Sequence, residues 1–175
     1  TRWLRREHRG HGNQGPALSL EIKALACLVP EEADTDLDEV DDEMAFIRSL
    51  IKQHSLADLS PAELSRRVVK RLLEAGNYSW LHVASHGRFS ANSPARDSRI
   101  ELPDGELTPQ DIIGLKIERH IRQARPAFIF NVCHGGRQGY SPTGLAGWAN
   151  RLLSNGSGLF ISPMWPAGDA CALSF

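Results

Sequence analysis

The chain has 175 residues, of which 41% are hydrophobic, and it carries 20 basic against 21 acidic residues, a formal net charge of −1. This length fits one domain with a full core, and the balanced charge argues against a nucleic-acid-binding or membrane-surface protein. No apolar run approaches the roughly 20 residues that a membrane span needs, and the 3 scattered cysteines are too few for a disulfide framework. We therefore expect a soluble, cytoplasmic protein with reduced thiols.

The N-terminal stretch differs in composition from the rest of the chain. We interpret residues 1–16 as a basic and glycine-rich linker or segment end, because polar residues and glycines dominate there. Residues 17–175 are predicted to form the folded domain. The chain begins without Met and stops at Phe175, where a helix is predicted to begin, so we expect the domain to be truncated at its C-terminal end.

Strand and helix patterns alternate along the folded part. Apolar runs predict core strands over 17–29, 78–85, 126–133 and 158–162. Capping signals and helical spacing predict four helices. The first covers 37–53 and has its cap at Thr35, and the second begins with a cap at Ser60-Pro61 and stops at Gly76. The third runs from a cap at Thr108 to about Gln123, and the fourth runs from Ser141-Pro142 to Asn155. An Asp-Gly turn predicts a hairpin over 99–107, and 86–98 is predicted to be a loop.

The pattern of apolar residues indicates the fold class. Runs such as AFIFNV are apolar on both faces, which is typical of strands buried between two helical layers. The helix that ends at Gly76 is expected to bury the stripe Leu64, Val68 and Leu72. Alternating strands and helices of this kind predict an α/β sandwich with a mostly parallel central sheet.

Two of the predicted strands end in reactive residues. The strand 78–85 leads into His86, and the strand 126–133 ends at Cys133. The carboxyl ends of parallel strands share one edge of the sheet, so an imidazole and a thiol could face each other there. An adjacent imidazolium raises the thiolate fraction of a cysteine, and the pair then performs nucleophilic acyl transfer.

The neighbours of these residues fit the same chemistry. The backbone N–H groups of Gly87 and Cys133 are predicted to form an oxyanion hole, and the glycines that follow both residues would let a substrate approach the main chain. A cysteine that closes a strand is more often a buried structural thiol. On spacing alone, the structural and the catalytic interpretations both remain open.

At these residues the sequence resembles the CHAT domains, caspase-like (clan CD) cysteine peptidases related to caspases, metacaspases and separase and often found with TPR repeats. The resemblance implies a caspase-like three-layer α/β/α sandwich with a mostly parallel central sheet, and a cysteine endopeptidase with His86 and Cys133 as its dyad. Such folds also place a strand between the first two helices, for which 54–59 is the weak candidate. The matching stretches are WLHVASHG (80–87), IELPDGELTPQDI (100–112), FIFNVCHGG (128–136), GLAGWANRLLSNG (144–156) and LFISPMWPAGDACALSF (159–175).

Substrate preference is predicted from two further residues. Asn131 precedes Cys133 by two positions, so both side chains should lie on the same face, and Asn131 is predicted to line the pocket for the residue before the cut. In relatives such as separase, an acid that resembles Asp169 accepts a basic residue, which implies a preference for Arg or Lys. Asp169 could also cap the helix that follows it. Arg88 and Arg137 could instead attract an acidic residue.

We expect no metal and no cofactor. His82 and His86 are four residues apart on a predicted strand, about 13 Å, which is too far for two ligands of one zinc ion. The expected partners are a protein or peptide substrate and a regulatory domain such as TPR repeats, with no nucleic acid and no membrane. The resemblance suggests regulated, limited cleavage in signalling or defence. The alternative is a catalytically silent interaction or scaffold domain that has kept the peptidase fold.

Overall fold

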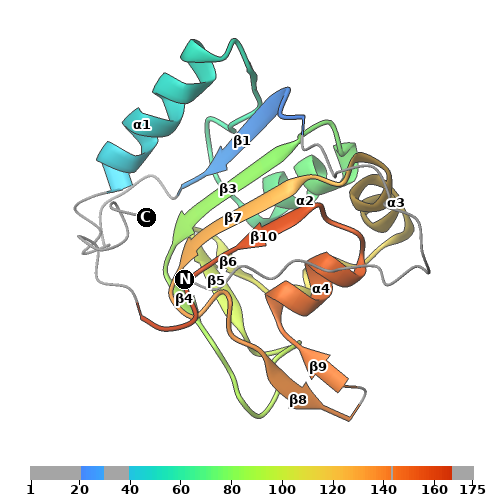
Figure 1. Cartoon of the computed structure of the whole chain (residues 1–175). Helices are drawn as coiled ribbons and strands as arrows, with labels where there is room; N and C mark the ends of the chain where they lie inside the picture. Colours follow the sequence, from blue (N-terminus) through green and yellow to red (C-terminus); the bar gives the residue numbers. More distant parts are fainter. Residues whose placement is uncertain (1–20, 30–39, 143, 167–175) are drawn as a thin grey trace, which may run out of the picture.

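A five-stranded parallel sheet forms the centre of the protein in the computed structural model, which describes residues 21–29, 40–142 and 144–166 (Figure 1). The predicted core strands are confirmed within the described residues, and residues 17–20 of the first prediction lie outside them. The weak pattern at 54–59 contains the short strand at the sheet edge. Neighbouring strands pair in parallel throughout. The order across the sheet is β10 (Leu159–Ile161), β7 (Ala127–Val132), β3 (Trp80–Ser85), β1 (Ala24–Leu28) and β2 (Ala57–Asp58).

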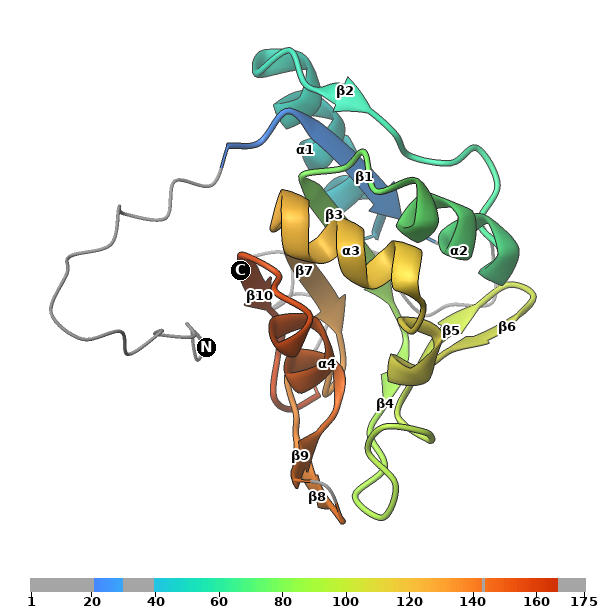
Figure 2. The same cartoon turned by 90° about the vertical axis from the view of Figure 1, so that its right-hand side faces the viewer.

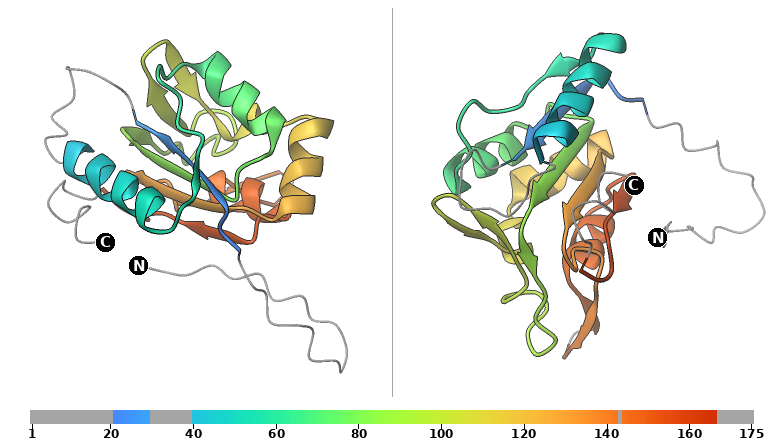
Figure 3. Two further views of the ribbon diagram at one scale, coloured as in Figure 1. Left: turned by 90° about the horizontal axis from the view of Figure 1, so that it is seen from above. Right: turned by 90° about the vertical axis from the view of Figure 1, so that its left-hand side faces the viewer.

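Helices cover both faces of this sheet, so the predicted three-layer sandwich is confirmed and is consistent with a caspase-like fold (Figures 2 and 3). Of the helices that the structure describes, α1 covers one face and the others cover the opposite face. In the described ranges, no helix combines the length and the apolar character that crossing a membrane requires. The helices are α1 (Val40–Gln53), α2 (Arg66–Ala75), α3 (Leu115–Ala124) and α4 (Trp148–Ser154).

The two faces have cores of different size. Under α2, α3 and α4 lies the larger core, in which the Phe130 ring of β7 contacts the Trp148 ring of α4 at a centroid distance of 5.5 Å. Under α1, a small cluster packs Ile47 and Ile51 against Leu25 and Cys27 of β1. Strands buried between two such layers must be apolar on both sides, which explains their nearly continuous hydrophobic sequence.

Two small antiparallel sheets extend from the sandwich. The predicted hairpin is confirmed as β5 (Arg99–Leu102) and β6 (Gly105–Leu107). The prediction of a loop over 86–98 is wrong at its start, because β4 (Gly87–Arg88) continues from the end of β3 and pairs with β5. A second hairpin, β8 (Gly139–Ser141) with β9 (Gly144–Ala146), lies after β7.

The start of α2 differs from the prediction. The cap is Ser65, whose hydroxyl accepts from the Val68 N–H at 3.2 Å, and not Ser60. Ser60 instead accepts from the Cys27 N–H of β1 at 3.0 Å, so a long-range contact uses the predicted cap. Because the helix begins later, its buried residues are Val69 and Leu73. The predicted stripe is confirmed at Leu64, which lies in the core before the helix, and Leu72 packs against that core only partly buried. The stop at Gly76 is confirmed.

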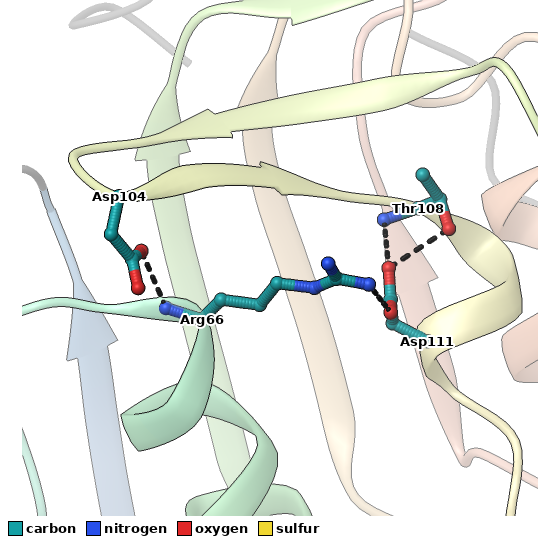
Figure 4. A network of polar contacts seen from close by, with 4 residues as sticks. All are labelled: Arg66, Asp104, Thr108 and Asp111. Carbon is teal, nitrogen blue, oxygen red and sulfur yellow. Dashed lines mark hydrogen bonds and ion pairs between the residues drawn. The ribbon is translucent and has the colours of Figure 1, made fainter.

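The capping box at Thr108 is confirmed, but the helix it starts is short. Asp111 Oδ2 accepts from the Thr108 N–H at 2.7 Å and from the Thr108 hydroxyl at 2.9 Å. This box caps only the 3₁₀ turn η1 (Pro109–Asp111), and α3 begins separately after Gly114. Asp111 also accepts from the Arg66 guanidinium, and the Arg66 N–H donates to Asp104 at 2.7 Å (Figure 4). These contacts join the start of α2 to both ends of strand β6.

The prediction of a helix from Ser141-Pro142 is wrong in its first part. Residues before Trp148 form the β8–β9 hairpin, and α4 begins at Trp148. Gly147 has a φ of 131°, which no helical residue adopts, and its missing side chain lets the Arg137 carbonyl approach. The helix therefore cannot extend back through this position. The predicted stop at Asn155-Gly156 is confirmed.

Candidate active site

The register of β3 and β7 brings His86 and Cys133 to one edge of the sheet. Ala84 lies beside Asn131, and Ser85 lies beside Val132, in parallel pairing. β3 ends at Ser85 and β7 at Val132, so His86 and Cys133 are the first residues after two paired strand ends. Both are partly exposed. Cys133 is therefore not sealed in the core, unlike Cys27, which is 3% exposed.

Strand alternation assigns these two residues to the face that α1 covers. On β3 and β7, Val83 and Val132 belong to the larger core on the opposite face. The side chains of His82 and Asn131 contact α1 instead. Since side chains alternate along a strand, a further step of one residue from Ser85 and Val132 returns to the α1 face. The backbone therefore brings the two residues of the predicted dyad to one face at one edge of the sheet.

Gly87 packs against the backbone of Cys133. A Cβ atom added at Gly87 would lie 2.0 Å from Val132 Cγ1 and 2.9 Å from the Cys133 carbonyl oxygen. No side chain fits there, so this glycine is required by contact with the protein's own chain, whereas the sequence suggested room for a substrate. The close approach brings the main chains of β4 and β7 together at the edge where His86 lies.

The direction of the Gly87 N–H follows from the pairing of β4 with β5. The Glu101 N–H donates to the His86 carbonyl at 2.9 Å, and Gly87 lies opposite Ile100. Bonded and non-bonded pairs alternate in an antiparallel ladder, so Gly87 occupies a non-bonded pair. Its N–H consequently points away from β5.

Asn131 lies on the α1 face, and its amide is held by a residue that the sequence did not single out. Asn131 Nδ2 donates to Glu43 Oε2 at 2.8 Å. The other oxygen of that carboxylate, Oε1, lies 2.7 Å from His82 Nε2. Glu43 of α1 therefore joins β3 and β7 immediately behind the edge where His86 and Cys133 lie. In the sequence it is one acid in the run Asp41-Asp42-Glu43, and no local signal separates it from its neighbours.

His82 is a buried residue of this face. It is 4% exposed, and in the described part of the chain its Nδ1 atom is buried without a hydrogen-bond partner. A proton on Nδ1 would have no acceptor, which is costly in a buried site. We therefore assign a proton to Nε2, which donates to Glu43.

The turn after Cys133 leaves the strand at once. His134 has a φ of 60°, and the Gly136 N–H donates to the Pro163 carbonyl at 2.8 Å, which ties the turn to the segment after β10. Arg137 lies over the Phe89 ring at 4.9 Å from its centroid. Arg88 and Arg137 are both exposed.

Some predicted features are not covered by the structure. Asp169 lies outside the described residues, as do residues 1–16 and the cap predicted at Thr35. Within 21–29, 40–142 and 144–166, no group of three or more His, Cys, Asp or Glu side chains is placed to hold a metal ion.

The chain matches one protein-family model over nearly its whole length. The family model described as the CHAT domain matches residues 2–175 of the chain. A search of curated proteins found no match.

Proposed function

Because the chain belongs to the CHAT domain family, a caspase-like peptidase family, we propose that it is a cysteine endopeptidase with His86 and Cys133 as its dyad. The observation that carries this proposal is the register of β3 and β7, which leaves both residues side by side at the carboxyl edge of the sheet. This edge is where open parallel sheets bind ligands.

The proposed reaction has two steps. The Cys133 thiolate attacks the scissile carbonyl carbon, the C–N bond breaks, and the His86 imidazolium gives its proton to the leaving amine, which produces a thioester. Neutral His86 then takes a proton from water, whose oxygen attacks the thioester and releases the carboxylic acid and the thiolate. The imidazolium and the thiolate are restored, so no further reactant is needed.

The oxyanion that forms in each step is assigned to the N–H groups of Gly87 and Cys133. The direction of the Gly87 N–H, away from β5, and the close packing of Gly87 on Cys133 support this assignment. Each such donor contributes about 2.7–4 kcal/mol to the stability of the transition state.

The substrate is proposed to be a protein partner, cut after a basic residue. Asn131 would line the pocket for that residue, and Asp169 would supply a carboxylate. Limited cleavage of this kind is proposed to occur in the cytoplasm, under control of a regulatory domain such as TPR repeats, in signalling or defence.

Labelling with a peptide acyloxymethyl ketone that carries arginine before the ketone tests the proposal. Attack by the thiolate expels the carboxylate and leaves a thioether that peptide mass mapping locates. We expect modification at Cys133 in the wild-type chain and its loss in His86→Ala. Iodoacetamide, which needs no binding site, serves as the control for thiol exposure. Equal labelling of the cysteines by the peptide probe, unaffected by His86→Ala, would refute the dyad and favour a scaffold domain.

A further inference from the structure

The Glu43 carboxylate connects α1 to both central strands of the sheet. It comes from the first turn of α1, which lies toward the edge where β3 and β7 end (Figure 1). Its two oxygens bond to His82 and to Asn131, 39 and 88 residues away in sequence. Asn131 is two residues before Cys133 on the same face, a distance of about 6.6 Å along a strand.

The contacts of this carboxylate with the described residues leave it able to attract a cation. In the described part of the chain its ion-pair partner is His82, whose imidazole is a cation only when both of its nitrogens carry a proton. No lysine or arginine of the described residues forms an ion pair with it. The Glu43 side chain is only partly exposed, so the attraction between its carboxylate and a cationic side chain is stronger there than in open water.

The carboxylate also remains able to bind. Its side chain is 13% exposed, so it keeps an opening to solvent, whereas that of His82 is only 5% exposed. Each oxygen of an ionised carboxylate has two acceptor positions, and contacts with the described residues use one on each oxygen of Glu43. The two remaining positions match the bidentate fork of a guanidinium, or one of them an ammonium.

We propose that Glu43 is the specificity-determining residue of the site, which selects arginine or lysine immediately before the scissile bond. Asn131 and His82 hold the carboxylate in place, and the long side chain of the substrate residue extends from Cys133 along β7 to reach it. This inference rests on the proposed peptidase function and deepens it. It differs from the assignment of the basic preference to Asp169.

The test compares two peptide acyloxymethyl ketones that differ only in carrying arginine or the uncharged norleucine before the ketone. The quantity measured is the ratio of their second-order labelling rates at Cys133. We expect the wild-type ratio to favour arginine by about tenfold or more, as for a charged hydrogen-bonded pair. Glu43→Gln should bring the ratio close to one, because the amide keeps the shape but loses the charge.

Matched variants separate specificity from folding. Asp42→Asn removes one charge from the same helical turn at an exposed position and should leave the ratio unchanged. Glu43→Asp keeps the charge on a shorter side chain and should lower the ratio, which keeps the proposal testable if Glu43→Gln fails to fold. Norleucine labelling reports the integrity of the dyad in every variant.

The outcomes distinguish this inference from the proposed function. An unchanged ratio in Glu43→Gln and Glu43→Asp, with labelling that still requires His86, would overturn the inference and leave the peptidase standing. Loss of the ratio in Asp169→Asn alone would overturn it in favour of Asp169. Absence of His86-dependent labelling by both probes in the wild-type chain would overturn both proposals.

Discussion

At the scale of single residues, contacts between distant parts of the chain set the surroundings of Cys133. Gly87 lies so close to Val132 and Cys133 that its lack of a side chain is a steric requirement. Glu43 bonds to the residue two positions before Cys133 and to the residue four positions before His86. The edge of the sheet is therefore fixed from two directions, by β4 and by α1.

Gly87→Ala tests the steric contact. The added methyl group would overlap Val132 Cγ1 and the Cys133 carbonyl, so we expect a loss of about 1–3 kcal/mol in the free energy of unfolding, measured with urea. Val132→Ala removes one of the two obstructing groups. The double variant Gly87→Ala/Val132→Ala should therefore lose less unfolding free energy than the sum of the losses in the two single variants. Strictly additive losses would contradict the contact.

At the scale of elements, the first turns of α1 and α2 are joined to neighbouring elements by polar side-chain contacts. The Arg66, Asp104, Thr108 and Asp111 network links the start of α2 to the hairpin and to η1 (Figure 4). Burial by itself would raise the pKa of Asp111, but the hydrogen bonds from Arg66 and Thr108 outweigh it and hold this pKa below the ordinary value of 3.8. The carboxylate form is therefore favoured by folding.

Asp111→Ala should lower the free energy of unfolding by about 1 kcal/mol at pH 7, as expected for a lost cap. A carboxyl with a depressed folded pKa stabilises the protein above its unfolded pKa, and the contribution disappears as the pH falls through the folded value. The difference between wild type and variant should consequently shrink below about pH 4. Urea unfolding at pH 7 and at pH 3 measures it.

Asp97→Ala, at an exposed carboxylate, is the control for this experiment and should stay within about 0.5 kcal/mol of wild type at neutral pH. A difference for Asp111→Ala that grows on acidification would show that the network does not stabilise the folded state through an ionised Asp111.

At the scale of the whole molecule, the two faces of the sheet are unequally anchored. The larger core under α2, α3 and α4 contrasts with the few buried residues under α1. Elements with few buried apolar contacts open at lower free energy than the global transition. Since Glu43 belongs to α1, opening of that helix would also remove the proposed specificity residue from the site.

Cys27 reports on this opening. Its Sγ atom lies 3.1 Å from Met44 Sδ of α1, and burial, with smaller contributions from Glu43 and Asp58, raises its pKa to about 12. We expect iodoacetamide to modify Cys27 much more slowly than Cys133 at pH 8. Ile47→Ala, which removes buried contacts of α1, should accelerate the labelling of Cys27 but not that of Cys133.

A matched core variant on the other face, Val69→Ala in α2, controls for general destabilisation. If it accelerates Cys27 labelling as much as Ile47→Ala does, α1 does not open separately from the rest of the domain. Mass spectrometry of the labelled peptides gives both rates in one experiment.

The sequence alone determined the parallel sheet and the positions of His86 and Cys133 at strand ends. Strand periodicity, apolar runs such as AFIFNV and the Asp-Gly turn are local signals, which can be recognised in a short stretch of sequence without knowledge of the fold. Helix starts were less predictable, because Ser60 bonds to β1 and Gly147 adopts a non-helical conformation.

Only the tertiary structure showed that Asn131 lies on the sheet face covered by α1 and that Glu43 holds its side-chain amide. The bond from Glu43 spans 88 residues, and nothing in the run Asp41-Asp42-Glu43 indicates which acid turns toward the sheet. The packing of Gly87 on Cys133 likewise depends on how β4 leaves β3. Contacts between segments far apart in the chain follow from the folded backbone, since the identity of a residue does not specify its distant neighbours.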